Sequence, residues 1–428
     1  MNRINTLLLI AFALYYIFNF IIFIYYHSIP LESDLDPRSH RRQHHSTGPI
    51  VVSSHEKKIQ FEEPRPYDAR EYEILRKQTL KSYDNVTTVA YPHGPFGGFR
   101  NVFMTFSGVM ILTKAANHSQ IIVPSIKWKD LFGTNERIRH DVMFDVVEWN
   151  KHYPVLPRFV EYEKERHPDI SFIGPAVRWN VENYMKDAKQ PFAVGEFGMQ
   201  AQNVYKQYVK NVVDHRKERS ELDLAILKGA FRPHPEIQNI MNTFIRMYGN
   251  EEYMVLHARI EPDMQRHDVC ADKKETNLTN IIKSLEKRFP DPPTSQILFI
   301  LNREILENEV FDTNVHNDMA EYNLKVLNDA REHGLWNGKV KVLEAGIGLA
   351  KDSQHPIYSK YYSLTGSIID FFLAVDANIF VGAEVSSFSV DVEITRFYRG
   401  KKANYHYTPN GLVWSTPPSA EFPSRFSC

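Results

Sequence analysis

The sequence predicts an α/β fold in which two Rossmann-like halves follow an N-terminal membrane anchor. Three observations support this prediction. Apolar runs typical of buried strands alternate with helical patterns, the alternation occurs in two separate sets, and an uncharged apolar segment precedes both sets. The 428 residues are enough for a short anchor and two domains of ordinary size.

Residues 7–26 form the uncharged segment, and its twenty residues are long enough to span the hydrocarbon core of a bilayer. The segment is longer than the apolar part of a signal peptide, and no small-residue cleavage site follows it. Arg3 precedes it, and the next Lys or Arg is Arg38. We therefore expect an uncleaved type II signal anchor, a cytosolic tail of residues 1–6 and a luminal body in the Golgi or the ER.

Residues 27–84 are polar, and we expect them to form a flexible stem between the membrane and the folded body. N-glycosylation sequons begin at Asn85, Asn117 and Asn277, which agrees with a luminal body. The two cysteines, Cys270 and Cys428, predict one long-range disulfide in an oxidising compartment, and two unpaired thiols are the alternative.

The first half, residues 85–248, begins with a β-like run at residues 88–91 and a turn-rich segment at residues 92–101. A helical pattern follows, with apolar or small residues at spacings of three and four, namely Val102, Phe103, Phe106, Val109, Met110 and Thr113. Residues 120–124 then predict a second strand. Strand, glycine turn, helix and strand make a βαβ unit, which implies a parallel sheet.

The second half, residues 249–428, repeats the alternation of strand and helix. Strands are predicted to begin at Tyr253 and at residues 296–301, 340–343 and 377–381, with helices at residues 314–332 and 363–374 between them. Two Rossmann-like halves are the natural architecture for this pattern, and ligands bind such sheets beyond the carboxyl ends of the strands.

Polar groups appear abruptly where the first strand of the second half ends. Alternation along a strand places His257, Arg259 and Glu261 on one face, so a cation and two potential proton carriers project from the end of the strand. Further along, Ser386 and Ser387 follow a buried strand and are expected to begin a helix that runs to about Tyr398. Gly400 stands near the C′ position of that helix, just past its end.

The string H-x-R-x-E-x-D-M from His257 to Met264, with Cys270 thirteen residues after the histidine, resembles the GDP-fucose protein O-fucosyltransferase family, in particular its plant-type branch. The segment from Asp370 to Ser389 is similar to a second signature of that family, D-x-x-x-x-x-x-x-D-x-F-I-G-x-x-x-S-S-F-[ST]. Asp370 matches its first Asp, and Asn378 stands where many members carry the second.

A third match, at Gly97 and Gly98, resembles the family string G-G-L-N-Q. Here Arg100 replaces the family Asn, unless Asn101 takes that role, and this departure concerns the acceptor side of the reaction. The three segments span most of the predicted luminal body. The resemblance implies a GT-B fold, with two Rossmann-like domains that face each other and a GDP-sugar bound mainly by the C-terminal one.

The resemblance implies that Arg259 grips the diphosphate and that the donor is bound by a wider set of residues, namely His257, Asp370, Ser386, Ser387, Phe388, Gly97, Gly98, Arg100 and Asn101. The expected activity is inverting transfer of fucose from GDP-fucose to a hydroxyl of a protein or glycan. Glu261 and Asp263 are candidates for a catalytic base or for orienting Arg259. Alternatives are another sugar, such as rhamnose, added to a polysaccharide, and an inactive sugar-nucleotide-binding protein.

We expect neither a metal nor a cofactor, because the D-x-D motif that would hold a nucleotide-bound metal occurs only at Asp34-Leu35-Asp36, in the predicted stem. The diphosphate would instead meet Arg259 and the free N–H groups at the helix start near Ser386. A formal net charge of −1, from 51 Lys and Arg against 52 Asp and Glu, gives no electrostatic footprint for a nucleic-acid partner.

Overall fold

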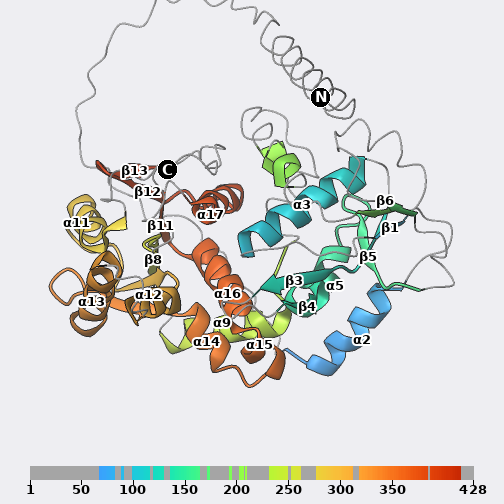
Figure 1. The fold of residues 1–428 in the computed structure, drawn as a ribbon, viewed down its shortest axis with the longest axis horizontal. Helices are drawn as coiled ribbons and strands as arrows, with labels where there is room; N and C mark the ends of the chain where they lie inside the picture. Colours follow the sequence, from blue (N-terminus) through green and yellow to red (C-terminus); the bar gives the residue numbers. More distant parts are fainter. Residues whose placement is uncertain are drawn as a thin grey trace, which may run out of the picture. The chain divides into compact units, whose positions relative to one another are not determined.

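Two sheets of mainly parallel strands organise the described part of the chain (Figure 1). The structure is a computed structural model, and it describes residues 67–81, 88–90, 99–115, 119–129, 135–163, 171–173, 192–194, 202–206, 208–209, 231–248, 252–261, 276–311, 318–383 and 386–415. All of them belong to one compact unit, Pro64–Cys428. Within these residues no helix is long and apolar enough to cross a membrane, and the segment 7–26 lies outside them.

The first sheet has the strand order β5-β2-β1-β7-β6, and all of its pairings are parallel. Its strands are β1 (Thr88–Ala90), β2 (Gln120–Ile122), β5 (Arg158–Val160), β6 (Ser171–Ile173) and β7 (Phe192–Val194). Helix α3 (Phe99–Ala115) connects β1 to β2, and Val89 pairs with Ile121. The predicted βαβ unit and its parallel sheet are therefore confirmed.

The second sheet has the strand order β10-β9-β8-β11-β12-β13. Its strands are β8 (Tyr253–His257), β9 (Gln296–Ile300), β10 (Lys341–Glu344), β11 (Ile379–Ala383), β12 (Asn404–Thr408) and β13 (Gly411–Trp414). Only β12 and β13 pair antiparallel. The order runs outward from β8 in one direction and then from β11 in the other, so the topological switch point of this doubly wound sheet lies between β8 and β11.

Helices connect the strands and cover the sheets (Figure 1). The longer ones besides α3 are α9 (Pro235–Met247), α11 (Leu278–Arg288), α12 (Arg303–Phe311), α13 (Asp318–His333), α16 (Tyr362–Asp376) and α17 (Ser387–Tyr398). The shorter ones are α4 (His140–Met143), α5 (Val146–Asn150), α14 (Gly346–Lys351) and α15 (Pro356–Lys360). A hairpin of β3 (Ser125–Lys129) and β4 (Asn135–Arg139) is inserted after β2. The helices predicted at 314–332 and 363–374 are confirmed as α13 and α16.

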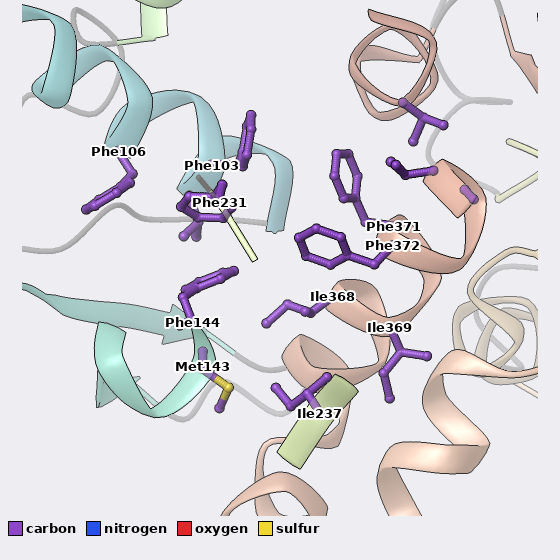
Figure 2. Close-up of a cluster of buried hydrophobic side chains, with 14 of the residues drawn as sticks. Phe103, Phe106, Met143, Phe144, Phe231, Ile237, Ile368, Ile369, Phe371 and Phe372 are labelled. Atoms are coloured by element: carbon purple, nitrogen blue, oxygen red, sulfur yellow. The ribbon is translucent and has the colours of Figure 1, made fainter. Parts of the chain in front are cut away.

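Aromatic and aliphatic side chains of α3 and α16 face each other in one hydrophobic cluster (Figure 2). Phe103 of α3 lies with its ring centroid 5.7 Å from that of Phe371 on α16 and 4.7 Å from that of Phe231. Ile237 at the start of α9 is fully buried in the same cluster. The helical periodicity of residues 102–113 thus marks the buried face of α3, and this face joins the first part of the chain to α16.

The prediction of a flexible stem over residues 27–84 is wrong at its C-terminal end. Residues Ala69–Thr79 form helix α2, which packs on the folded body. The carboxylate of Asp68 caps this helix by accepting from the backbone N–H groups of Arg70 and Glu71, at 2.8 and 3.2 Å. Tyr72 is buried and donates its hydroxyl to Asp145 at 3.0 Å. Amphipathic spacing behind a capping residue therefore outweighs the polar composition of the segment.

Helix α17, which follows β11, is fixed to the second sheet through the buried guanidinium of Arg396. Its three nitrogens donate to six oxygen atoms, the backbone carbonyls of Ala374, Val375, Ala377, Asn378 and Ala403 and the Oδ1 of Asn404. Burial lowers the pKa of Arg396 to about 10. The carbonyl groups in the last turn of α16 lack intrahelical partners, and this guanidinium satisfies those of Ala374 and Val375.

His140 is buried among aromatic rings, and neither of its ring nitrogens has a hydrogen-bond partner within the described residues. It stacks on Phe106 with ring centroids 4.2 Å apart and on Phe144 at 4.6 Å. Burial lowers the pKa of His140 from 6.5 to about 3, although the neighbouring charge of Asp141 acts in the opposite direction. The imidazole is therefore neutral at any pH near neutrality.

We expect a His140→Phe variant to become more stable relative to the wild type as the pH falls. Between the folded pKa of about 3 and the unfolded value of 6.5, the unfolded chain binds a proton at His140 that the folded protein does not. Stability is therefore lost as the pH falls, by about 1.4 kcal/mol per pH unit for this group. The free energy of unfolding of the variant relative to the wild type should rise at that rate between about pH 6 and pH 4. Chemical denaturation at several pH values measures it, and a constant difference would contradict it.

Candidate active site at the switch point

The residues singled out at positions 257–261 lie at the carboxyl end of β8, next to the switch point of the second sheet. The strand itself ends at His257 instead of continuing to Glu261. Ala258 still donates its N–H to the carbonyl of Ile300 at 3.0 Å, so the chain follows β9 for one more residue. Ala258 and Ile260 are fully buried, and the polar side chains of the predicted set alternate with them.

His257 is buried and held by the start of α17. Its Nδ1 lies 2.7 Å from the hydroxyl of Ser389, and that hydroxyl also accepts from the backbone N–H of Ala383 at 2.9 Å. The ring of Phe388 covers it, with centroids 4.6 Å apart. Burial lowers the pKa of His257 to about 3, and the nearby charge of Arg259 acts in the same direction. His257 is therefore a neutral residue that links β8 to α17.

Arg259 is positioned by three different parts of the second sheet. Its backbone N–H donates to the hydroxyl of Tyr407 on β12 at 2.8 Å, and its Nη1 donates to Oε2 of Glu261 at 2.7 Å. The other oxygen of Glu261 accepts from the backbone N–H of Asn302, after β9, at 3.0 Å. Glu261 is buried, whereas the Arg259 side chain keeps a quarter of its surface exposed, with a relative accessibility of 25%. The carboxylate thus holds a guanidinium that solvent still reaches.

Helix α17 begins at Ser387, with Ser386 as the N-cap residue, and ends at Tyr398, as the sequence predicted. Gly400 has a φ of 83°, the left-handed conformation expected just past a helix end. The side chain of Ser386 makes no capping hydrogen bond to the helix. Backbone N–H groups in the first turn of this twelve-residue helix therefore point beyond the carboxyl end of β11.

A glycine allows α17 to approach β11 closely. A Cβ on Gly382 would lie 2.6 Å from both the Cβ and the Oγ of Ser389, so any side chain at position 382 would push the helix start away from the strand. Phe388 is partly buried between His257 and Phe371, with ring centroids 4.6 and 5.6 Å away. The end of β8 and the start of α17 thus form one packed group.

Asp370, also expected at the donor site, lies on α16 and contacts α14. Its Oδ1 accepts from the backbone N–H of Gly346 at 2.9 Å, and a Cβ on Gly346 would collide with the carboxyl group. Burial raises the pKa of Asp370 to about 7, and the hydrogen bond from Gly346 opposes that shift. The contacts of Asp370 join two helices, and none of those found places it beside Arg259.

Several residues predicted for the site, the disulfide and glycosylation lie outside the part of the chain that the structure describes. The structure does not describe Gly97, Gly98, Asp263, Cys270, Cys428, Asn85 or Asn117. Arg100 and Asn101 belong to the first turn of α3, without described side chains. Asn277 caps α11 by accepting from the N–H of Asn280 at 3.1 Å, and its Nδ2 lies 3.7 Å from Sδ of Met319. The disulfide and the glycosylation sites remain predictions.

Sequence reasoning did not assign four groups that hold the site, namely Ser389, Tyr407, Asn302 and Gly382. Ser389 belongs to the S-S-F-S string and stands three residues after Ser386. That spacing places it in the first turn of the predicted helix, which was a usable signal. Tyr407 reaches Arg259 because β12 pairs with β11 in a register that sets it opposite Ala383. Among the described residues, no group of three or more His, Cys, Asp or Glu side chains is placed to hold a metal ion.

No family model matches the chain, and no curated protein matches its sequence. Solved structures with a similar arrangement include POFUT1 in complex with GDP, at 13% identity and a TM-score of 0.44, covering 76% of this chain and 99% of that one. A mutant of Arabidopsis thaliana FUT1 in complex with GDP is 10% identical with a TM-score of 0.40, covering 84% of this chain and 76% of that one. NodZ alpha-1,6-fucosyltransferase soaked with GDP-fucose is 12% identical with a TM-score of 0.42, covering 77% and 98%. Likeness at this level does not assign the chain to a family.

Proposed function

We propose that the chain is an inverting glycosyltransferase that moves fucose from GDP-fucose to a hydroxyl group of a protein or glycan. The proposal includes a GT-B arrangement, in which the second sheet binds the donor and the first sheet faces the acceptor. It also includes a type II anchor at residues 7–26 and a luminal body in the Golgi or the ER. The resemblance of the three sequence segments supplies the identity of the donor.

The observation that carries the proposal is that Arg259 and the start of α17 follow neighbouring strands, with His257, two residues before Arg259, in contact with Ser389 in the first turn of α17. Both lie at carboxyl ends of neighbouring strands, β8 and β11, where doubly wound sheets bind their ligands. A partly exposed guanidinium and the N–H groups of a helix start are both suited to a diphosphate.

The reaction breaks the bond between C1 of the sugar and a β-phosphate oxygen, and the oxygen of the acceptor hydroxyl forms the new bond to C1. Negative charge grows on the leaving diphosphate, and Arg259 with the α17 start would stabilise it without a metal. The acceptor proton passes to a base. We assign Glu261 to orienting Arg259, because both of its oxygens already accept hydrogen bonds. Asp263 remains the candidate base.

The proposal predicts that GDP and GDP-fucose raise the thermal stability of the full-length protein, because a ligand that binds only the folded state stabilises it. At a ligand concentration of about a hundred times Kd, the stabilisation is about 2.7 kcal/mol. UDP and ADP, tested at the same concentration, are the matched controls. The shift and the release of GDP from GDP-fucose should both persist in excess EDTA.

Each result in this panel has a separate meaning. A thermal shift with UDP or another nucleoside diphosphate, but not with GDP, would mean that the donor sugar is carried by that nucleotide. A shift with GDP but no turnover with any acceptor tested would favour the inactive binding protein. Loss of turnover in EDTA that one specific metal restores would contradict the metal-independent chemistry and the role given to Arg259.

A further inference from the structure

We propose that Tyr205 and Asp391 are positioning residues that fix the donor-binding start of α17 relative to the start of α3. The inference rests on the proposed function, because it concerns how that site is held in its reactive geometry. Neither residue belongs to the sequence motifs, and 186 positions separate them in the chain. Tyr205 lies in the helical segment 202–206, between the two sheets in sequence.

The contact itself is a buried hydrogen bond. The hydroxyl of Tyr205 donates to Oδ1 of Asp391 at 3.1 Å, and the two residues are 1% and 0% exposed. Breaking a hydrogen bond between two buried groups is costly, because each group loses a partner that water cannot replace. It is therefore suited to fixing one geometry between two elements that are remote in sequence.

Asp391 lies on the part of α17 that carries the proposed donor contacts. It is four residues after Ser387 and three after Phe388, so these three side chains share one face of the helix. Phe388 in turn covers His257 at the end of β8. A displacement of Asp391 would consequently move the first turn of α17, which is the turn assigned to the diphosphate.

Tyr205 is attached to α3 as well as to α17. Its ring meets Phe103 of α3 edge to face, with centroids 5.9 Å apart. In the same short segment, Nε2 of Gln202 donates to Oγ1 of Thr105, also on α3, at 3.1 Å. Because α3 begins at Phe99 and α17 at Ser387, Tyr205 connects the first two turns of α3 to the first two turns of α17.

The test compares Tyr205→Phe with Tyr358→Phe in the full-length protein. Tyr358 is the control, since it is 1% exposed and lies in α15, away from α17. Its hydroxyl donates to the carbonyl of Val142 at 3.1 Å and also lies 2.9 Å from Nδ1 of His234. Both variants lose one buried hydroxyl, and thermal melts should show similar destabilisation. Only Tyr205→Phe should lower kcat for release of GDP from GDP-fucose, by about tenfold or more. The affinity for GDP should fall less than kcat does, because negative charge on the diphosphate grows in the transition state.

Substitutions at Asp391 separate positioning from a general loss of packing. Asp391→Asn keeps an oxygen that accepts from Tyr205 and should retain most of kcat, whereas Asp391→Ala should lose about as much as Tyr205→Phe. The double variant Tyr205→Phe/Asp391→Ala should lose less than the sum of the two single losses, because both single variants remove the contact between the two residues. Additive losses, or equal kcat in Tyr205→Phe and Tyr358→Phe, would overturn the inference. A protein that does not bind GDP would instead refute the proposed function.

Discussion

The Arg259→Lys variant is expected to lose about 99% of fucosyl transfer while keeping its fold, a hundredfold effect that corresponds to about 3 kcal/mol in the activation free energy. Lysine preserves the charge and can still meet Glu261, but it lacks the planar fork that holds two phosphate oxygens at once. The loss should appear mainly in kcat, since the charge on the diphosphate grows in the transition state. Steady-state rates with GDP-fucose measure it, together with a thermal melt that checks the fold.

Arg246→Lys is the matched control for this substitution. Arg246 lies on α9 and donates within that helix, to the carbonyl of Asn242 and the hydroxyl of Thr243. The same change of side chain at that exposed place should leave the rate within a few-fold of the wild type. If Arg259→Lys were equally active, the leaving diphosphate would not depend on Arg259, and the donor site would have to lie elsewhere.

The second large effect is expected from removing α2. A chain that begins at residue 84 loses the buried side chains of Tyr72 and Leu80, which are 8% and 3% exposed, and the ion pair of Arg76 with the buried Asp141. Burial of two such side chains contributes about 4 kcal/mol, which corresponds to a fall of about 5 °C in Tm for a domain of this size. Gel filtration and thermal melts of the two shortened chains, beginning at residues 64 and 84, give the comparison.

The chain that begins at residue 64 is the control, because residues 64–428 form one compact unit. Two point variants in the full-length protein refine the result: Arg76→Ala removes the ion pair with Asp141, and Lys77→Ala removes only an exposed pair with Glu73. Arg76→Ala should lower Tm and Lys77→Ala should not. Equal melting temperatures for the two shortened chains would mean that α2 contributes no stability to the body.

Most of the strand–helix alternation was predictable, because buried strands are continuous apolar runs and buried helix faces repeat every three or four residues. The β12–β13 hairpin escaped prediction although Asn410-Gly411 is a hairpin signal, and Thr408 pairs with Gly411 in the structure. The short strands β5, β6 and β7 have three residues each, too few for a period to show. Helix α2 was hidden by polar composition, yet Asp68 and Glu71 were present as a capping signal.

The site was predictable where it is local in sequence and unpredictable where it depends on the register of strands. Polar residues after a buried strand identified His257, Arg259 and Glu261, and the pairing of Arg259 with Glu261 follows from their spacing. The hydroxyl of Tyr407 reaches Arg259 only because β12 lies beside β11. Asp370 was placed at the donor by resemblance, whereas its described contact joins α16 to Gly346.

The guanidinium of Arg396 has a consequence for random mutagenesis of this protein. It lies about three turns of helix away from Ser386, at the opposite end of α17, and a substitution there frees six oxygen atoms at once. A variant with such a substitution would show no activity in the screen, although every residue proposed to contact the donor is present. A screen by activity alone would therefore rank Arg396 with Arg259, and only a parallel measure of folded protein would separate an anchor from a reactive group.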